Sequence, residues 1–381
     1  MIKYEKLFES FFLGGFECST HRLATGKRLD EIAATQHDRF AREDYLRLPQ
    51  IGIRTAREGL RWHLIERSPG VYDFSSVLPM LRAAQQNGIQ TIWDLFHYGW
   101  PDWLDLFASR FVDKFARFAR EFARLWSNET DDILFVSPIN EISFFAWGAG
   151  EVGYLNPFFK GRGDELKNHL VRATIAACEA LWEIDSRTRI TQIDPMINVL
   201  ALDPSDAKLA KAAEDYRLSQ FEAWDMVSAR IRPELGGAEK YLDVIGGNYY
   251  VHNQWILGGS FIEPGHPRYR PLRNIISEVY ERYGRPFFIA ETGIEDDLRP
   301  SWFRYVCDEA LAAAQAGVQL EGICLYPIVN HPGWDDDRHC HNGLWDYPDE
   351  KGNREIYEPL SEELARQQQK FSKAYTGRAG V

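Results

Sequence analysis

The feature that most constrains the fold is a series of eight apolar segments spread along the 381 residues, most of them followed by a stretch with helical spacing. Two of these segments end in a carboxylate. Segment 134–143 carries Asn140 and Glu141 after an apolar run, and segment 286–293 ends its apolar run at Glu291. Such runs are typical of strands that are buried on both faces. Because a carboxylate has no role in an apolar core, both glutamates are candidates for chemistry.

The predicted strands alternate with predicted helices. We expect strands over residues 11–18, 52–60, 89–97, 134–141, 189–194, 241–250, 286–291 and 320–327. Apolar residues at helical spacing predict helices over residues 28–48, 78–87, 111–126, 166–184, 207–229, 272–283, 301–316 and 358–376. Strands that alternate with helices form a parallel sheet.

Eight strand–helix units predict an α/β fold, a (β/α)₈ TIM barrel that forms one catalytic domain over residues 1–381. The alternative is an open, doubly wound sheet. Sheets of that kind usually carry a glycine-rich phosphate-binding turn after the first strand, and the G-x-G-x-x-G pattern is absent here. The barrel is therefore the preferred interpretation.

Charge and cysteine usage narrow the class of protein. The net charge of −12 argues against nucleic acid or an anionic membrane surface as a partner. The five cysteines are scattered, which predicts neither a disulfide framework nor a zinc finger. The first ten residues carry acids and lack an apolar core, so we expect no signal peptide, and no apolar run is long enough to cross a membrane. We expect a cytoplasmic protein without cofactor or metal.

Aromatic residues make up 14% of the chain, including 12 tryptophans. Carbohydrate sites use aromatic faces to stack on the C–H surfaces of sugars, so this excess favours a carbohydrate ligand. Filling of a large core accounts for the same composition equally well. Trp100, Trp103 and Trp147 fall in predicted loops and are candidates for stacking, with core packing as the alternative.

Polar side chains at the ends of different strands converge on one pocket in a closed barrel. The candidates are Glu17, Arg57, His97, Asn140, Glu141, Asn248, Tyr250, Glu291 and Tyr326. Two carboxylates in different environments can divide the labour, because one stays protonated as an acid while the other stays ionised as a nucleophile. We expect Arg57 to keep Glu291 ionised and Tyr250 to orient it.

The strand-end motifs also carry a family resemblance. Asn140-Glu141 and Glu291 resemble the catalytic signature of clan A glycoside hydrolases, and the chain is most similar to glycoside hydrolase family 1, the β-glucosidase family. The similar segments are residues 12–15, 52–62, 96–104, 245–250 and 342–347. The resemblance implies a retaining β-glycosidase that acts on a small carbohydrate. It implies Glu141 as acid/base, Glu291 as nucleophile and His97 as a sugar-binding residue.

The chain departs from the family pattern at four places. Ile142 stands where the family has proline, and residues 290–293 read Ala-Glu-Thr-Gly in place of Thr-Glu-Asn-Gly. The family's glutamine after the first strand is missing, with His21 or Arg22 near its place, and residues 333–334 replace a Glu-Trp pair. These departures imply a sugar other than plain glucose. One hypothesis is that Arg22 pairs with an acidic sugar.

The loop over residues 331–341 is rich in possible ligands. It can bind sugar hydroxyls through Trp334, Asp335 and Asp336, bind a metal ion, or be an inert polar loop. Three other functions therefore remain open beside the glycosidase: a non-catalytic sugar-binding barrel, a transglycosylase, and a metal-dependent hydrolase. Self-association into a homo-oligomer is left open as well.

Overall fold

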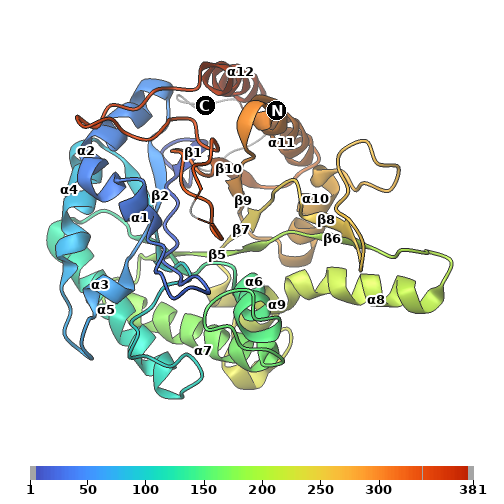
Figure 1. Ribbon diagram of the computed structural model, residues 1–381, viewed down its shortest axis with the longest axis horizontal. Helices are drawn as coiled ribbons and strands as arrows, with labels where there is room; N and C mark the ends of the chain where they lie inside the picture. Colours follow the sequence, from blue (N-terminus) through green and yellow to red (C-terminus); the bar gives the residue numbers. More distant parts are fainter. Residues whose placement is uncertain (1–5, 337, 376–381) are drawn as a thin grey trace.

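The computed structural model describes residues 6–336 and 338–375. Eight parallel strands close into a barrel at the centre of the molecule, and helices surround it (Figure 1). Around the barrel the strands follow the order β1, β10, β9, β7, β5, β4, β3, β2. Their bounds are β1 Phe12–Gly15, β2 Thr55–Gly59, β3 Gln90–Phe96, β4 Phe135–Ile139, β5 Arg189–Pro195, β7 Val244–Asn248, β9 Phe287–Thr292 and β10 Leu320–Leu325. This architecture confirms the predicted single-domain (β/α)₈ barrel.

The strands are buried on both faces, as their continuous apolar character requires. A small cluster that includes Leu13, Ile92, Phe135 and Phe288 draws alternate residues from several strands and fills the barrel interior. The residues between them, such as Val136, face outward and join a much larger cluster with the surrounding helices. The period of two along each strand thus divides its side chains between the two cores.

The helices pack on the barrel through apolar stripes. The longer ones are α2 His37–Arg47, α4 Leu78–Gln86, α5 Arg110–Glu129, α7 Gly163–Trp182, α8 Ala207–Leu218, α10 Leu272–Tyr283, α11 Arg299–Gln315 and α12 Glu358–Ala374. In α5, Phe111, Phe115, Phe118 and Phe122 recur at steps of three and four residues and are all buried. The opposite face of α5 carries its charged residues, which is why this segment was recognisable as a helix.

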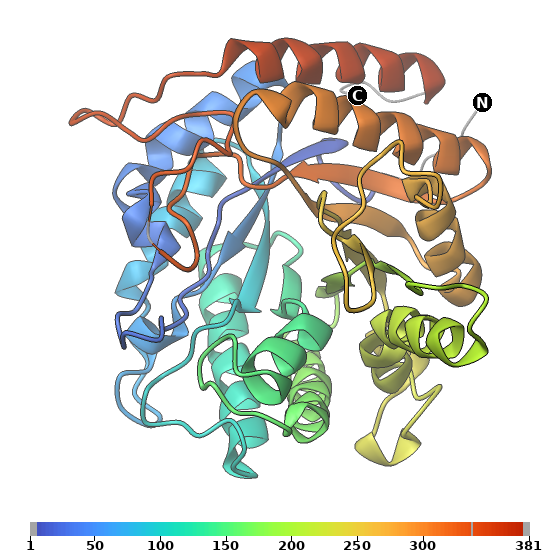
Figure 2. The ribbon, with the colours of Figure 1, turned by 45° about the vertical axis from the view of Figure 1, so that its right-hand side comes forward.

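The C-terminal helix α12 lies beside α11 (Figure 2). It ties the end of the chain to the beginning, because Phe371 and Tyr375 pack their rings on Phe11 just before β1. Residue 376, the last one of the helix expected from the sequence, lies outside the described residues, as do residues 1–5 of the N-terminal segment. Over the described ranges, no helix has the length and apolar character that a membrane span needs.

Two predicted helices are interrupted. The helix expected over residues 28–48 is divided into α1 (Glu31–Ala34) and α2, because Gln36 between them adopts a left-handed conformation with φ of 55°. The helix expected over residues 207–229 is divided into α8 and α9 (Glu222–Val227) by a 3₁₀ turn. Only Ala213 of α8 is buried, whereas α9 is almost entirely buried, so the chain must turn from the surface into the core between them.

The structure also contains elements that were not predicted. A two-stranded sheet pairs β6 (Asn198–Leu200) with β8 (Gln254–Ile256) beside the ends of β5 and β7 (Figure 1). After β4, the short helix α6 (Ile142–Phe145) continues into one π-helical stretch, η3 (Ala146–Glu151). A further short helix, α3 (Trp62–Ile65), follows β2. Three-residue strands and single helical turns are too short to give a periodic sequence pattern.

Candidate active site

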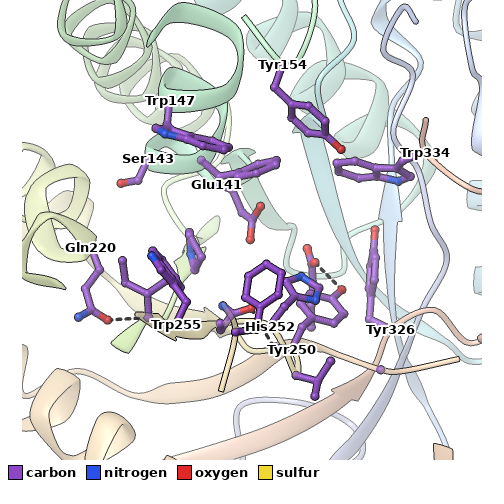
Figure 3. A pocket seen from close by; sticks show the side chains of 18 of the residues that line it. Glu141, Ser143, Trp147, Tyr154, Gln220, Tyr250, His252, Trp255, Tyr326 and Trp334 are labelled. Carbon is purple, nitrogen blue, oxygen red and sulfur yellow. Dashed lines mark hydrogen bonds between the residues drawn. The ribbon is translucent and has the colours of Figure 1, made fainter. Parts of the chain in front are cut away.

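The carboxyl ends of the barrel strands open into one large cavity of about 1190 Å³. The side chains of Glu17, Glu141 and Glu291 line it together with aromatic residues. In Figure 3 the Glu141 carboxylate points into this space, with Trp147 and Trp334 nearby and Tyr250 and Tyr326 across from it. The cavity lies where a (β/α)₈ barrel places its functional groups.

The backbone at the end of β4 turns Glu141 into the cavity. The N–H of Asn140 still donates to the Phe96 carbonyl (3.0 Å), and that of Glu141 donates to the Ile193 carbonyl (3.0 Å). Glu141 itself has φ of 49°, a left-handed conformation that side chains other than glycine adopt rarely. Holding a residue in this conformation costs on the order of 1–3 kcal/mol, and such positions cluster at functional sites.

The Glu141 carboxyl group contacts neutral donors. Its Oε2 accepts a hydrogen bond from the Tyr98 hydroxyl (2.6 Å), and its Oε1 accepts one from the Asn248 amide (2.9 Å). Burial, together with the negative charge of Glu291, raises the pKa of Glu141 to about 7. A carboxyl group with this pKa can carry a proton near neutral pH and can also release it.

The Glu291 carboxylate, near the end of β9, contacts a cation and a phenol. Its Oε1 accepts from Arg57 Nη1 (2.7 Å), and its Oε2 accepts from the Tyr250 hydroxyl (2.8 Å). The hydrogen bond from the guanidinium is charge-assisted, the stronger class of hydrogen bond. The two glutamates therefore have different partners in one cavity, Glu141 with neutral groups and Glu291 with a positive one.

Arg57, on β2, connects the surroundings of both glutamates. It is fully buried, and besides Glu291 it donates to both oxygens of Asp94 (3.1 and 2.6 Å) and to Asn140 Oδ1 (2.7 Å). One guanidinium on β2 therefore holds side chains from three other strand segments, and one of them, Asn140, directly precedes Glu141. The planar fork of arginine suits this set of partners, and lysine cannot reproduce it.

We expect Arg57→Lys to lower kcat by about 10²-fold or more, the usual effect of removing one preorganised charged donor. The measurement is steady-state kinetics on an activated aryl β-glycoside, with thermal unfolding followed in parallel. Arg354→Lys is the matched control, because Arg354 is also buried and paired, with Asp44, but lies outside the cavity. It should lower the unfolding temperature while leaving kcat within about twofold. A near-normal kcat for Arg57→Lys would make Arg57 a structural residue.

His97 and Tyr326 complete the inner part of the cavity. His97 Nδ1 lies 2.8 Å from Asp94 Oδ2, its Nε2 lies 3.2 Å from the Asn140 amide nitrogen, and its ring is parallel to that of Tyr326. Tyr326 also lies against the Arg57 guanidinium, 5.0 Å from ring centre to Cζ. The barrel thus joins seven of the nine predicted strand-end residues through hydrogen bonds, with Tyr98 as a link, while Tyr326 packs on the group and Glu17 lies beside His97.

Two residues of this group were missed by the sequence analysis. Asp94 lies inside strand β3, and Tyr98 follows it with φ of 60°. The signal for Asp94 was available, since a carboxylate in the middle of an apolar strand has to find a buried cation. The role of Tyr98 depends on its contact with Glu141, which the sequence alone does not reveal.

Two predicted sugar contacts lie elsewhere. Arg22 does not line the cavity; its guanidinium forms an ion pair with Asp102 (2.5 Å). The hypothesis that Arg22 pairs with an acidic sugar finds no support in this arrangement, because the charge of Arg22 is already matched by Asp102. Asp335 is also absent from the described lining and accepts from the Tyr154 hydroxyl (2.9 Å), whereas Trp334 does line the cavity.

In the part of the chain that the structure describes, groups of metal-ligating side chains occur at two places. His339, His341 and Asp346 lie close together at the surface around the 331–341 loop, in which residue 337 is outside the described part. The second group, Cys18, Asp94 and His97, is buried. Both oxygens of Asp94 accept from Arg57, so a guanidinium already supplies the positive charge at this second group.

Comparison with known proteins shows the fold. No protein-family model matches the sequence, and no curated protein matches it either. Among solved structures, the family 1 β-glucosidase from Thermotoga maritima in complex with isofagomine lactam superposes with a TM-score of 0.78 at 16% identity, covering 96% of this chain and 99% of that chain. The same enzyme in complex with glucoimidazole superposes with a TM-score of 0.78 at 16% identity, covering 96% of this chain and 98% of that chain. The AHE enzyme from Alicyclobacillus herbarius superposes with a TM-score of 0.76 at 16% identity, covering 96% of this chain and 99% of that chain. The likeness spans nearly the whole barrel.

Proposed function

We propose that this protein is a retaining β-glycosidase, a divergent relative of the family 1 β-glucosidases, with Glu291 as nucleophile and Glu141 as acid/base. The observation that carries the proposal is the contrast between the two carboxyl groups of one cavity. Glu291 is bonded to the Arg57 guanidinium, and Glu141 is bonded to neutral donors with its pKa raised to about 7. Paired carboxyl groups whose environments differ in this way suit acid and nucleophile roles.

In the first step, Glu291 attacks the anomeric carbon and forms an ester bond to the sugar. The bond between that carbon and the leaving oxygen breaks, and the electron pair goes to the oxygen, which takes the proton from Glu141. The Tyr250 hydroxyl and Arg57 hold Glu291 in place for this attack. In the second step, water attacks the anomeric carbon, Glu141 takes its proton, and the ester bond to Glu291 breaks. Two inversions retain the configuration of the sugar.

The outer part of the cavity suits an aglycone or further sugar units. The volume of the whole cavity, about 1190 Å³, exceeds the roughly 300–1,000 Å³ typical of ligand pockets. Trp147, Trp255 and Phe261 line it away from the inner group of polar residues, and Phe261 is 64% exposed. Open aromatic faces at the entrance favour stacking against a flat or sugar-like group.

Trapping of the covalent intermediate tests the proposal. We expect an activated 2-deoxy-2-fluoro β-glycoside to inactivate the enzyme and to add one fluorosugar to the peptide that contains Glu291, as detected by mass spectrometry. Glu291→Gln is the control and should remain unlabelled. Saturable binding of the reagent without any adduct, and without turnover of aryl glycosides, would instead favour a non-catalytic sugar-binding barrel.

A transglycosylase is the second candidate, favoured by the space beside the inner group. The same intermediate on Glu291 can be transferred to a sugar hydroxyl in place of water, and Trp147 and Trp255 offer surfaces for an acceptor. Product analysis with added acceptor sugars separates the two reactions. Free sugar as the main product at high acceptor concentration supports the hydrolase, and a longer glycoside supports the transglycosylase.

A further inference from the structure

Glu17 is a third carboxylate in the inner part of the cavity, two residues after β1. Its side chain is 4% exposed and lines the cavity. Oε1 accepts a hydrogen bond from the Ser19 N–H (2.8 Å), and His97 Nε2 lies 3.8 Å from the same oxygen. Within residues 6–336 and 338–375, Oε2 receives no hydrogen bond. Since Glu17 lines the cavity, this oxygen can accept a hydrogen bond from a ligand bound there.

Glu17 and Glu291 both line the cavity, and the negative charge of each acts on Tyr250. Burial and the negative charges of Glu291 and then Glu17 raise the pKa of the Tyr250 phenol. The Tyr250 hydroxyl donates to Glu291, so the field of Glu17 reaches the group that contacts the reacting carboxylate. The contacts connect the two carboxylates as well: His97 Nε2 lies 3.8 Å from Glu17 Oε1 and 3.2 Å from the Asn140 amide nitrogen, and Asn140 shares the Arg57 guanidinium with Glu291. Glu17 therefore lies beside the group that holds Glu291.

Among the described residues that line the cavity, no lysine or arginine is left unpaired to bind an anion. Among its described lining residues are seven carboxylate side chains and two basic ones, Lys167 and Arg338. Each basic residue forms an ion pair with a carboxylate of the same cavity, Lys167 with Glu222 and Arg338 with Glu295. Burial lowers the pKa of His331, which lies near Glu17, so its imidazole is neutral at pH 7.

We propose that Glu17 determines the charge class of the sugar, accepting hydrogen bonds from its hydroxyl or ammonium groups and selecting neutral or amino-bearing rings over anionic ones. The proposal rests on the glycosidase function proposed above. A carboxylate or phosphate on the sugar would meet the Glu17 carboxylate, and the Lys167 and Arg338 cations are already paired with carboxylates of the cavity. Like charges placed together across an interface disfavour binding strongly. An ammonium group would instead gain a charge-assisted hydrogen bond.

The kinetic test compares 4-nitrophenyl β-glycosides of one sugar series: glucoside, glucosaminide, glucuronide and 6-phosphoglucoside. We expect the two anionic substrates to show less than about 1% of the kcat/KM of the glucoside, in line with repulsion between unscreened like charges. Glu17→Gln should raise the ratio of glucuronide to glucoside by about tenfold or more, since it keeps the shape and removes the charge. Glu129→Gln, an equal change in net charge far from the cavity, should leave the ratio unchanged.

Binding measurements keep the inference separate from the proposed function. Calorimetry with methyl β-glucosaminide and methyl β-glucuronide on the Glu141→Gln variant needs no turnover and keeps the ion pair between Arg57 and Glu291. We expect tighter binding of the glucosaminide, and loss of that preference in the Glu17→Gln, Glu141→Gln double variant. Equal or tighter binding of the glucuronide, or a preference that survives in the double variant, would overturn the role of Glu17. Absence of turnover for every glycoside would overturn the glycosidase proposal alone.

Discussion

Replacing Glu291 by alanine should reduce kcat by about 10⁴-fold or more, the scale seen when a catalytic nucleophile is removed. The variant lacks the atom that forms the bond to the anomeric carbon, and no other described carboxylate accepts from both Arg57 and Tyr250. Residual activity should then depend on an external nucleophile. Azide or formate should restore turnover of an aryl β-glycoside with a good leaving group, because the alanine leaves room for a small anion beside the positive charge of Arg57.

The product identifies the mechanism. With azide, the Glu291→Ala variant should release the α-configured glycosyl azide, because one inversion replaces the usual two. The fold should persist, since Arg57 keeps both hydrogen bonds to Asp94. Thermal unfolding of the variant checks this point. A folded Glu291→Ala protein that keeps more than about 1% of wild-type kcat without azide would exclude Glu291 as the nucleophile.

The barrel could be predicted because its strands are buried on both faces and end in polar residues. A strand such as β4 appears in the sequence as an apolar run, and the closure of the sheet then determines which strand ends meet. Asn140, Glu141 and Glu291 were found by this reasoning alone. Arg57 was found in the same way, as a polar residue near the end of the second predicted strand.

The loops around the cavity could not be predicted in the same way. Arg22 and Glu17 are five residues apart, yet Arg22 pairs with Asp102 at the surface whereas Glu17 lines the cavity. Sequence position alone does not distinguish them, since the direction of each side chain depends on loops without periodicity. The small sheet of β6 and β8 was not predicted either, because its two strands have three residues each, too few for a periodic sequence pattern.

Replacing Glu141 by alanine should affect substrates unequally, with the effect determined by the leaving group. For alkyl or sugar leaving groups, which need a proton as the bond breaks, we expect kcat/KM to fall by about 10²–10⁴-fold, the usual contribution of general acid catalysis. For a 2,4-dinitrophenyl leaving group, which departs as a stable anion, kcat/KM should change much less. Equal losses on both classes of substrate would count against the acid role.

The pH dependence gives an independent test of the same residue. Glu141 has to be protonated in the free enzyme to act as the acid, and its pKa is raised to about 7 by burial and by the charge of Glu291. The kcat/KM of wild type on a poor leaving group should therefore decline as the pH rises through about 7, when the acid loses its proton. Glu141→Gln should abolish this alkaline decline, because glutamine does not titrate.

The Asn248→Asp variant tests whether the surroundings of Glu141 set this pKa. A second negative charge beside Glu141 should raise the pKa of Glu141 further and move the decline to higher pH. A decline that persists in Glu141→Gln, or that does not move in Asn248→Asp, would assign the titration to another group.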